Sequence, residues 1–176
     1  KIGIVGLGNI GLNVARIAKG FGMNILVNTR TPDPSICKGI EIEFVSLEEI
    51  FEISDFIVLS LPLVRETRGL ICKQTINLMK ENCIIVNVSR GEIVVTDDLY
   101  EGIISGKIYG AGLDVTDPEP LPKDHPLWNL ENVFISPHNS SRTPETQNLA
   151  IKKTCENLLD ALSGLKPIGL VNTKVF

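Results

Sequence analysis

The sequence predicts an α/β fold, namely a doubly wound and mostly parallel sheet with helices on both faces. Two observations carry this prediction. Short apolar runs rich in Val and Ile alternate along the chain with segments of helical spacing. The first run leads directly into Gly6-Leu-Gly8-Asn-Ile-Gly11, where a strand would turn into a helix.

Seven strands are expected, because each apolar run is bounded by glycine, proline or polar residues. The runs are continuously apolar, as in parallel strands that are covered on both faces. Their ranges are Ile2–Val5, Asn24–Asn28, Glu43–Val45, Phe56–Leu61, Ile84–Val88, Gly110–Asp114 and Val133–Ile135.

Three helices are expected from apolar spacing and capping residues. The first ends at Gly20 and Gly22, and one face of it carries Ile10, Val14, Ile17, Ala18 and Phe21. Ser46 and Glu49 form a capping box for the second. Thr143 caps the longest helix, whose core-facing positions are Ile151, Cys155, Leu158, Leu159 and Leu162.

Composition argues against several classes of partner. The 176 residues carry a net charge of −4 and no basic run, which disfavours nucleic acid. No apolar run is long enough to span a membrane, and no signal peptide precedes the first strand. The cysteines lack metal-ligand or disulfide spacing and suit a reducing compartment; they are Cys37, Cys72, Cys83 and Cys155. We therefore expect a soluble, cytoplasmic protein without a bound metal.

The glycine-rich turn predicts a Rossmann-type dinucleotide site. Gly6 permits a tight turn, Gly8 lets backbone N–H groups approach a pyrophosphate, and Gly11 lets helix and strand pack closely. The motif alone has little specificity, and a merely glycine-rich turn is the alternative. The apolar strand before it and the amphipathic helix after it favour dinucleotide binding.

The end of the second strand favours NADP over NAD as the cofactor. An NAD site has Asp or Glu here for the ribose hydroxyl, whereas this chain has Asn28-Thr29-Arg30-Thr31. A guanidinium can bind a 2′-phosphate through two N–H groups, and the neighbouring hydroxyls and amide can donate to its oxygens. In the alternative, Arg30 is a solvated charge and Asp33 serves the ribose of NAD.

Five stretches together resemble the D-isomer-specific 2-hydroxyacid dehydrogenases. They are the glycine turn, "LSLPLVRETRGLI" (59–71), "IIVNVSRGEIVVTDDL" (84–99), "GAGLDVTDPEPLP" (110–122) and "HPLWNLENVFISPHNSS" (125–141). The segments "NTRT" and "DVTDPEPLP" most resemble the glyoxylate/hydroxypyruvate reductase branch. The resemblance implies an NAD(P)-dependent oxidoreductase that acts on C2 of a small 2-oxo or 2-hydroxy acid.

The same resemblance implies a domain arrangement. Residues 1–165 correspond to the dinucleotide-binding domain, and 166–176 to a C-terminal segment that returns toward a substrate domain. That substrate domain has no counterpart in this chain, which agrees with a first residue, Lys1, that stands directly before an apolar strand. By resemblance alone, a homodimer is expected.

The resemblance assigns catalysis to Arg90 of "VSRG", Glu119 of "DPEP" and His138 of "SPH". Arg90 follows a strand at the edge where such sheets bind ligands, and its fork suits a carboxylate and carbonyl. His138 suits proton exchange near neutral pH, and Glu119 would fix its tautomer and favour the protonated ring. As alternatives, Arg90 is a surface arginine and Glu119 is a plain loop carboxylate like Asp117.

The remaining expectations concern the cofactor and the second histidine. His125, between loop prolines, is expected to be structural beside Trp128. By resemblance, the cofactor-binding residues are Gly6, Gly8, Asn9, Ile10, Gly11, Asn28, Thr29, Arg30, Thr31, Leu61, Pro62, Val88, Asp114 and His138. Thr67 is a weaker candidate with a possible structural role.

One departure from the family pattern and one alternative function accompany the resemblance. The family usually has small residues after the histidine, whereas this chain has Asn139-Ser140-Ser141, which puts the pose of His138 in doubt. The alternative function is a nucleotide-sensing, corepressor-like binding module of the same fold. The complete set of three catalytic residues favours the enzyme.

Overall fold

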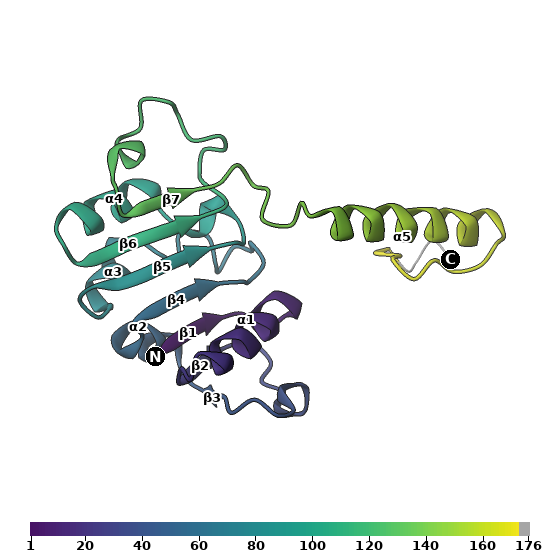
Figure 1. Cartoon of the computed structure of the whole chain (residues 1–176), viewed down its shortest axis with the longest axis horizontal. Coiled ribbons are helices and arrows are strands. Elements are labelled where there is room, and N and C mark those ends of the chain that lie inside the picture. The colour runs from purple at the N-terminus through teal and green to yellow at the C-terminus, as the bar shows by residue number, and fades with distance from the viewer. Residues whose placement is uncertain (173–176) are drawn as a thin grey trace. The chain divides into compact units, whose positions relative to one another are not determined.

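The computed structural model describes residues 1–172 and divides into two compact units, 1–138 and the segment from 139 on. The first unit contains the whole sheet, and the second contains one long helix (Figure 1). The last four residues of the predicted return segment, 173–176, lie outside the described residues. No helix in residues 1–172 has the length and apolar character needed to cross a membrane.

The first unit is built on seven strands that pair in the order β3-β2-β1-β4-β5-β6-β7, and every pairing is parallel. This confirms the predicted fold class. The strands are β1 (Ile2–Val5), β2 (Ile25–Asn28), β3 (Glu43–Phe44), β4 (Phe56–Leu59), β5 (Cys83–Asn87), β6 (Ile108–Leu113) and β7 (Val133–Ile135). All seven predicted strands form, with ends that differ by at most two residues.

Four α-helices and three short 3₁₀ turns lie between the strands in residues 1–172, and a fifth helix follows β7. The helices are α1 (Asn9–Gly20), α2 (Leu47–Ile53), α3 (Lys73–Leu78), α4 (Thr96–Ile104) and α5 (Pro144–Leu162). The 3₁₀ turns are η1 (Pro34–Cys37), η2 (Gly91–Ile93) and η3 (Pro126–Asn129). The predicted capping box on α2 is confirmed, because Ser46 Oγ accepts from the Glu49 amide and Glu49 Oε2 accepts from the Ser46 amide. Thr143 caps α5 as predicted.

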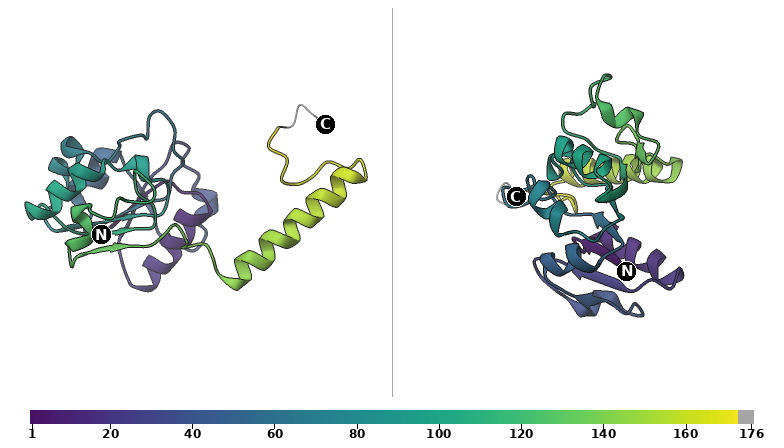
Figure 2. Two further views of the ribbon diagram at one scale, coloured as in Figure 1. Left: turned by 90° about the horizontal axis from the view of Figure 1, so that it is seen from above. Right: turned by 90° about the vertical axis from the view of Figure 1, so that its left-hand side faces the viewer.

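Helices cover both faces of the sheet, and two apolar clusters form between the layers (Figure 2). Successive residues of β4 divide between them, since Ile57 and Leu59 join the cluster under α2, α3 and α4 whereas Val58 joins the cluster under α1. Parallel strands that are buried on both faces explain the continuous apolar runs of the sequence.

The predicted apolar face of α1 is largely exposed. Ile10, Ile17 and Phe21 are 54%, 62% and 80% exposed, while the buried residues of the helix are Gly11, Ala15 and Ala18. The small side chains face the sheet because the helix passes close to the strands at Gly11. Apolar spacing indicated the helix correctly, but residue size decides which stripe is buried.

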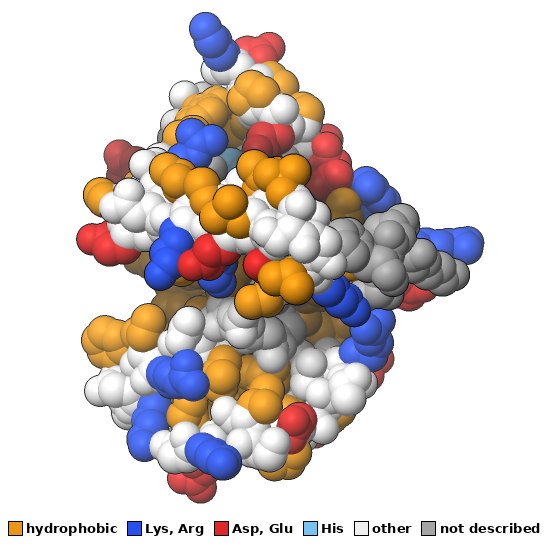
Figure 3. All heavy atoms as spheres, turned by 90° about the vertical axis from the view of Figure 1, so that its right-hand side faces the viewer, with side chains coloured by type: hydrophobic (Ala, Val, Ile, Leu, Met, Phe, Trp, Pro, Cys, Tyr) orange, Lys and Arg blue, Asp and Glu red, His pale blue; other side chains and the backbone are white. Residues whose placement is uncertain are grey.

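The core-facing positions predicted for α5 are also wrong for the residues that the structure describes. Ile151, Leu158, Leu159 and Leu162 are all more than half exposed, Cys155 is exposed as well, and no residue of α5 is buried. Orange spheres in Figure 3 show that large apolar side chains reach the surface of the chain. The second unit offers this helix no sheet of its own, so the helical pattern is present without a core.

Candidate active site

The glycine turn between β1 and α1 is shaped by contacts that only glycine permits. Gly6 has φ +95°, and a Cβ on it would lie 2.7 Å from the Ser60 carbonyl oxygen. A Cβ on Gly11 would lie 2.1 Å from the Gly6 carbonyl oxygen. Around the Cβ position of Gly8 there is nothing within 4 Å. The first and third glycines therefore serve the protein's own packing, whereas Gly8 leaves open space.

The open space lies at the amino end of α1. Gly8 is the N-cap residue, it makes no side-chain cap, and no acidic residue lies in the first turn. The free N–H groups and the helix dipole make this end attractive to an anion. Asn9 and Ile10 begin the helix here, so a pyrophosphate fits the charge and the space of the turn.

The loop after β4 is attached to the glycine turn. The Ser60 hydroxyl donates to the Gly6 carbonyl oxygen at 2.8 Å, which places Leu61 and Pro62 beside the turn. The Thr67 hydroxyl donates to the Pro62 carbonyl oxygen at 2.8 Å and accepts from the Val64 amide. These bonds give Thr67 a structural role in holding the loop.

The residues after β2 differ in how they are engaged. The side-chain amide of Asn28 donates to the Val45 carbonyl oxygen at 3.0 Å. Thr29 is half-buried, and Thr31 is exposed. Asp33 caps η1, and its bonds with Ser35 lower the pKa of that carboxyl. The Arg30 guanidinium is exposed and forms no hydrogen bond or ion pair with any residue in 1–172. Arg30 is thus an exposed cation two residues after the carboxyl end of β2.

Arg90 follows β5 in a loop that buried polar groups hold in place. Asn87 is fully buried, and its side-chain amide donates to the Arg90 carbonyl oxygen at 2.9 Å. The Ser89 hydroxyl donates to the Leu59 carbonyl oxygen at 2.9 Å. The exposed Arg90 side chain donates to the Ser89 carbonyl oxygen and has no carboxylate partner in the described chain. Its charge is therefore available to an anionic ligand.

Glu119 and His138 are brought together from loops that follow β6 and β7. The His138 Nδ1 and Glu119 Oε1 atoms are 2.7 Å apart, and both side chains are somewhat less than half exposed. A carboxylate at this distance accepts a hydrogen bond from Nδ1–H, which fixes the tautomer and the orientation of the ring. The Nε2 atom is left for another partner.

The backbone of His138 is held independently of its side chain. Its φ is +50°, in the left-handed region, and its amide donates to the Asp114 carbonyl oxygen at 2.9 Å. The buried Asp114 carboxylate accepts from the Ser136 hydroxyl at 2.7 Å. The end of β6 therefore fixes the turn that presents the imidazole.

His125 has a structural environment. Its Nδ1 atom accepts from the Leu127 amide at 3.2 Å, which caps η3. Its Nε2 atom lies 3.5 Å from the Asp97 carboxylate, and its ring meets Tyr100 edge-on. The Trp128 amide donates to the His125 carbonyl oxygen. These contacts agree with the predicted structural role beside Trp128.

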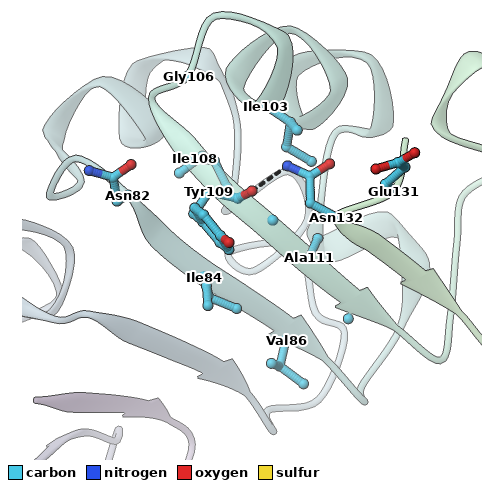
Figure 4. Close-up of a pocket in the computed structure, with 12 residues that line it drawn as sticks. Asn82, Ile84, Val86, Ile103, Gly106, Ile108, Tyr109, Ala111, Glu131 and Asn132 are labelled. Atoms are coloured by element: carbon cyan, nitrogen blue, oxygen red, sulfur yellow. Dashed lines mark hydrogen bonds between the residues drawn. The ribbon is translucent and has the colours of Figure 1, made fainter. Parts of the chain in front are cut away.

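A cavity of about 520 Å³ adjoins Glu119 and His138. It is lined by Asp114, Thr116, Glu119, Pro120, Leu121, Trp128, Ile135, Ser136, Pro137 and His138. A larger pocket of about 840 Å³ lies over β5 and β6; Figure 4 shows Ile84 and Val86 on β5 and a hydrogen bond from the Asn132 side-chain amide to the Tyr109 carbonyl oxygen. The larger pocket is lined by Tyr109 and Glu131 but by no histidine, whereas the smaller cavity is lined by both Glu119 and His138.

The structure describes no group of three or more His, Cys, Asp or Glu side chains in residues 1–172 that is placed to hold a metal ion. Of the four free cysteines, Cys37 and Cys83 are buried, Cys72 is half-buried and Cys155 is exposed. Burial raises the pKa of the Cys83 thiol to about 12, which makes it a poor nucleophile.

Sequence reasoning missed the residues that hold these loops. Asn87 had a recognisable signal, since it is a polar residue within an apolar strand run. Ser60, Ser89 and Thr116 had none, because their hydroxyls bond to backbone carbonyls that lie elsewhere in the fold or in their own loop.

Comparisons with known proteins agree with this geometry. Residues 1–140 match the family described as D-isomer specific 2-hydroxyacid dehydrogenase, NAD binding domain. The chain is 44% identical to a glyoxylate reductase of Korarchaeum cryptofilum, over 99% of this chain and 52% of that protein. It is 46% identical to a human glyoxylate reductase/hydroxypyruvate reductase, over 93% of this chain and 50% of that protein.

Solved structures that resemble the chain are also 2-hydroxyacid dehydrogenases and glyoxylate reductases. A glyoxylate reductase from Paecilomyes thermophila superposes with a TM-score of 0.90 at 33% identity, over 98% of this chain and 52% of that one. The NAD-complexed D-isomer specific 2-hydroxyacid dehydrogenase from Lactobacillus delbrueckii ssp. bulgaricus gives 0.90 at 26% identity, over 97% and 55%. The chain thus spans about half the length of the relatives it matches.

Proposed function

Because this chain belongs to the D-isomer specific 2-hydroxyacid dehydrogenase family, within its NAD binding domain, we propose that it is the nucleotide-binding part of an NAD(P)-dependent 2-oxoacid reductase. The substrate class we propose is a small 2-oxo or 2-hydroxy acid such as glyoxylate or hydroxypyruvate, which the names of the relatives support. The observation that carries the proposal is the 2.7 Å pair of His138 and Glu119 in the unit that holds the glycine turn.

Each catalytic residue has a separate task in this proposal. The nicotinamide, when bound, supplies or accepts the hydride. Arg90 binds the substrate carboxylate and polarises the carbonyl through its guanidinium fork. His138 donates a proton from Nε2 to the carbonyl oxygen as negative charge grows there. Glu119 holds the ring through Nδ1 and fixes its tautomer.

The cofactor residues act mainly by position. The amides of Asn9 and Ile10 bind the pyrophosphate at the open end of α1. Leu61 and Pro62 form the wall on the adenine side, next to the Ser60 bond to the glycine turn. Val88 and Asp114, at the ends of β5 and β6, lie on the nicotinamide side. Membership in an NAD binding domain family supports this part of the proposal.

We further propose that NADP is preferred over NAD. No carboxylate follows β2 at the ribose position, and Asp33 is engaged as the cap of η1. Arg30 is exposed and has no partner among residues 1–172. A bound 2′-phosphate would form an ion pair with the Arg30 guanidinium. Asn28 contributes less, because its amide already bonds to the Val45 carbonyl.

Nucleotide titration tests the preference. NADPH should bind more tightly than NADH by more than about tenfold, or roughly 1.4 kcal/mol. Arg30→Ala should remove that difference without weakening NADH, because only the 2′-phosphate contact is lost. Arg16→Ala, which removes an exposed arginine of α1, should leave the preference unchanged. Equal affinities for the two nucleotides in the unsubstituted chain would contradict the NADP proposal.

An activity assay tests the reaction. A polypeptide that joins this chain to a substrate-binding half like that of its relatives should oxidise NADPH with glyoxylate or hydroxypyruvate. The 176 residues alone should bind nucleotide but turn over 2-oxo acids poorly, since closure of the site and exclusion of water need a second domain. Absence of turnover with every 2-oxo acid in the longer polypeptide would contradict the proposal. The alternative of a nucleotide-sensing module is not favoured by the reductase names of the relatives.

The proposal also covers the domain boundaries of the chain, its oligomeric state and its cellular compartment. Residues 1–165 act as the dinucleotide-binding domain, and 166–176 return toward a substrate domain. A homodimer in the cytoplasm is proposed by resemblance to the family, and four free thiols suit that compartment. Gel filtration with light scattering checks the dimer, since a monomer at micromolar concentration would contradict it.

A further inference from the structure

The position of Glu119 depends on the loop that leads into it, because its own carboxylate bonds only to His138 among the described residues. The loop leaves β6 at Asp114 and passes through Thr116, Asp117 and Pro118 before it reaches Glu119. A charge-assisted hydrogen bond of 2.7 Å loses most of its strength if one partner moves by about an ångström. The contacts of this short segment therefore decide whether the catalytic pair stays formed.

Three successive carbonyl groups of the segment are held. The Thr116 carbonyl packs against Gly91, where a Cβ would lie 1.9 Å from the oxygen. The Pro118 carbonyl accepts from the Thr116 hydroxyl at 2.9 Å. The Asp117 carbonyl accepts from the Thr96 hydroxyl at 2.6 Å. Of these contacts, only the last is a hydrogen bond from a side chain outside the loop.

The donor of that bond lies on a rigid element. Thr96 is the first residue of α4, and the helix is anchored in the core through Leu99 and Ile103, which are almost fully buried. The backbone just before it is tied to the strand region by the bond from the Val95 amide to the Ile71 carbonyl. Because α4 is fixed in the core, the hydrogen bond from the Thr96 hydroxyl restrains the loop at Asp117.

We propose that Thr96 is a positioning residue for the Glu119–His138 pair, a role that rests on the function proposed above. Its hydroxyl fixes the Asp117 carbonyl two residues before Glu119, so that the carboxylate meets Nδ1 of an imidazole whose own backbone is held from Asp114. Without the hydroxyl, residues 116–118 lose their hydrogen bond from outside the loop, and Glu119 leaves Nδ1 for part of the time, although the bond from Trp128 Nε1 to the Pro122 carbonyl still holds the chain after Glu119.

The charged groups around this contact do not supply a substitute. Asp97, next to Thr96, is 93% exposed on its side chain and faces the Nε2 atom of His125. Arg68 and Glu92 line a separate small pocket together with Thr96 and Asp117, and they pair with each other at 3.7 Å. None of these pairs contacts Glu119 or His138.

The imidazole tautomer of His138 is the most direct readout, because it reports the Glu119 contact without any turnover. The chain has two histidines, so their ¹⁵N resonances can be assigned with a His125→Gln variant. At a pH where the ring is neutral, the unsubstituted chain should hold the proton on Nδ1. Thr96→Val should change the tautomer ratio toward Nε2–H by about tenfold, and Thr96→Ser should restore it. Glu119→Gln gives the limit of complete loss.

A kinetic test in the longer polypeptide distinguishes positioning from general stability. Thr96→Val should lower kcat by about tenfold at unchanged NADPH affinity and move the pH–rate limb in the direction of Glu119→Gln. A Thr96→Val chain with the tautomer ratio of the unsubstituted chain would overturn the proposal. If valine prevents folding, Thr96→Ala serves in its place and is judged by the same ratio. Absence of reductase activity in the unsubstituted polypeptide would refute the proposed function alone, since the tautomer ratio is measured without substrate.

Discussion

The two halves of the sheet contribute to the site by different means. At the turn between β1 and α1, the proposed site is made of backbone, since Gly6, Gly8 and Gly11 shape a turn whose N–H groups face open space. Around β5, β6 and β7, the site is made of side chains, namely Arg90, Glu119 and His138. All of these groups follow the carboxyl ends of parallel strands, so the two kinds of construction share one edge (Figure 1).

The difference follows from what each half has to bind. A pyrophosphate needs only hydrogen-bond donors and positive potential, which peptide groups at a helix end supply. Proton transfer needs a group that titrates near neutral pH, which only a side chain supplies. Substitutions should therefore affect the two halves differently. An added methyl group in the glycine turn should lower nucleotide affinity, whereas a changed functional group at His138 should lower kcat.

The largest effect is expected from His138→Gln in the polypeptide that carries both domains. Glutamine keeps a polar side chain but cannot donate the proton, so kcat should fall by about 10²–10⁴ while nucleotide affinity stays the same. Steady-state kinetics with NADPH and glyoxylate measure the loss. His125→Gln is the control and should retain kcat, because His125 caps η3 and is not part of the proposed catalytic pair. Near-normal kcat with an unchanged pH profile in His138→Gln would show that the proton comes from elsewhere.

An intermediate effect is expected from Gly11→Ala in the backbone-built half. The new Cβ would lie 2.1 Å from the Gly6 carbonyl oxygen, so α1 and β1 must move apart. Overpacking of this kind costs about 1–3 kcal/mol, and nucleotide affinity should fall by more than about tenfold. Thermal unfolding and fluorescence titration measure the two losses. Gly20→Ala, whose Cβ meets nothing within 4 Å, is the matched control and should change neither.

The smallest effect is expected at Asp55, which lies before β4, between the halves and away from the site. Its carboxylate bonds to Lys80 and to the N-terminal ammonium, and these contacts lower its pKa to about 2, with the Lys80 bond the largest cause. Because the pKa is lowered in the folded state, the ionised carboxylate stabilises the fold fully at pH values above about 3.9, the pKa of an unpaired aspartate. That stabilisation is lost as pH falls through about 2.

Asp55→Asn should therefore lower Tm at pH 7 by about 1–4 °C, since the pair is partly exposed and contributes less than about 1 kcal/mol. The difference in Tm from the unsubstituted chain should shrink between pH 4 and pH 2. Asp124→Asn, which removes an exposed loop carboxylate, should show no such difference. Loss of nucleotide affinity in Asp55→Asn would contradict the separation of this contact from both halves of the site.

The strands were predictable because parallel strands leave continuous apolar runs, and β1 and β7 have their predicted bounds. The helices α3 and α4 were not predicted, since six and nine residues are too few to show a clear apolar period. For α1 and α5, spacing identified the helix but not the environment of its apolar side chains. Which stripe is buried depends on the neighbouring layer, and the sequence of one helix does not encode that layer.

The site divides in the same way. Arg90, Glu119 and His138 were selected from motifs, and the structure brings Glu119 and His138 into contact while Arg90 bonds to neither. Thr96 had no signal, because its hydroxyl bonds to a backbone carbonyl 21 residues away. Every residue has such a carbonyl, so a sequence pattern cannot indicate which one accepts. Positioning contacts of this kind become visible only once the loops are folded.

Calorimetric titration of NADPH into the 176-residue chain and its Gly8→Ala and His138→Gln variants tests the central claim most directly. A Cβ on Gly8 meets no protein atom within 4 Å, so the variant should unfold at the same temperature as the unsubstituted chain. It should nevertheless bind the nucleotide at least about tenfold more weakly, because the methyl group occupies the space of the pyrophosphate. His138→Gln should bind with unchanged affinity. Unchanged affinity in Gly8→Ala, or an equal loss in His138→Gln, would contradict a site whose binding half is backbone and whose catalytic half is side chain.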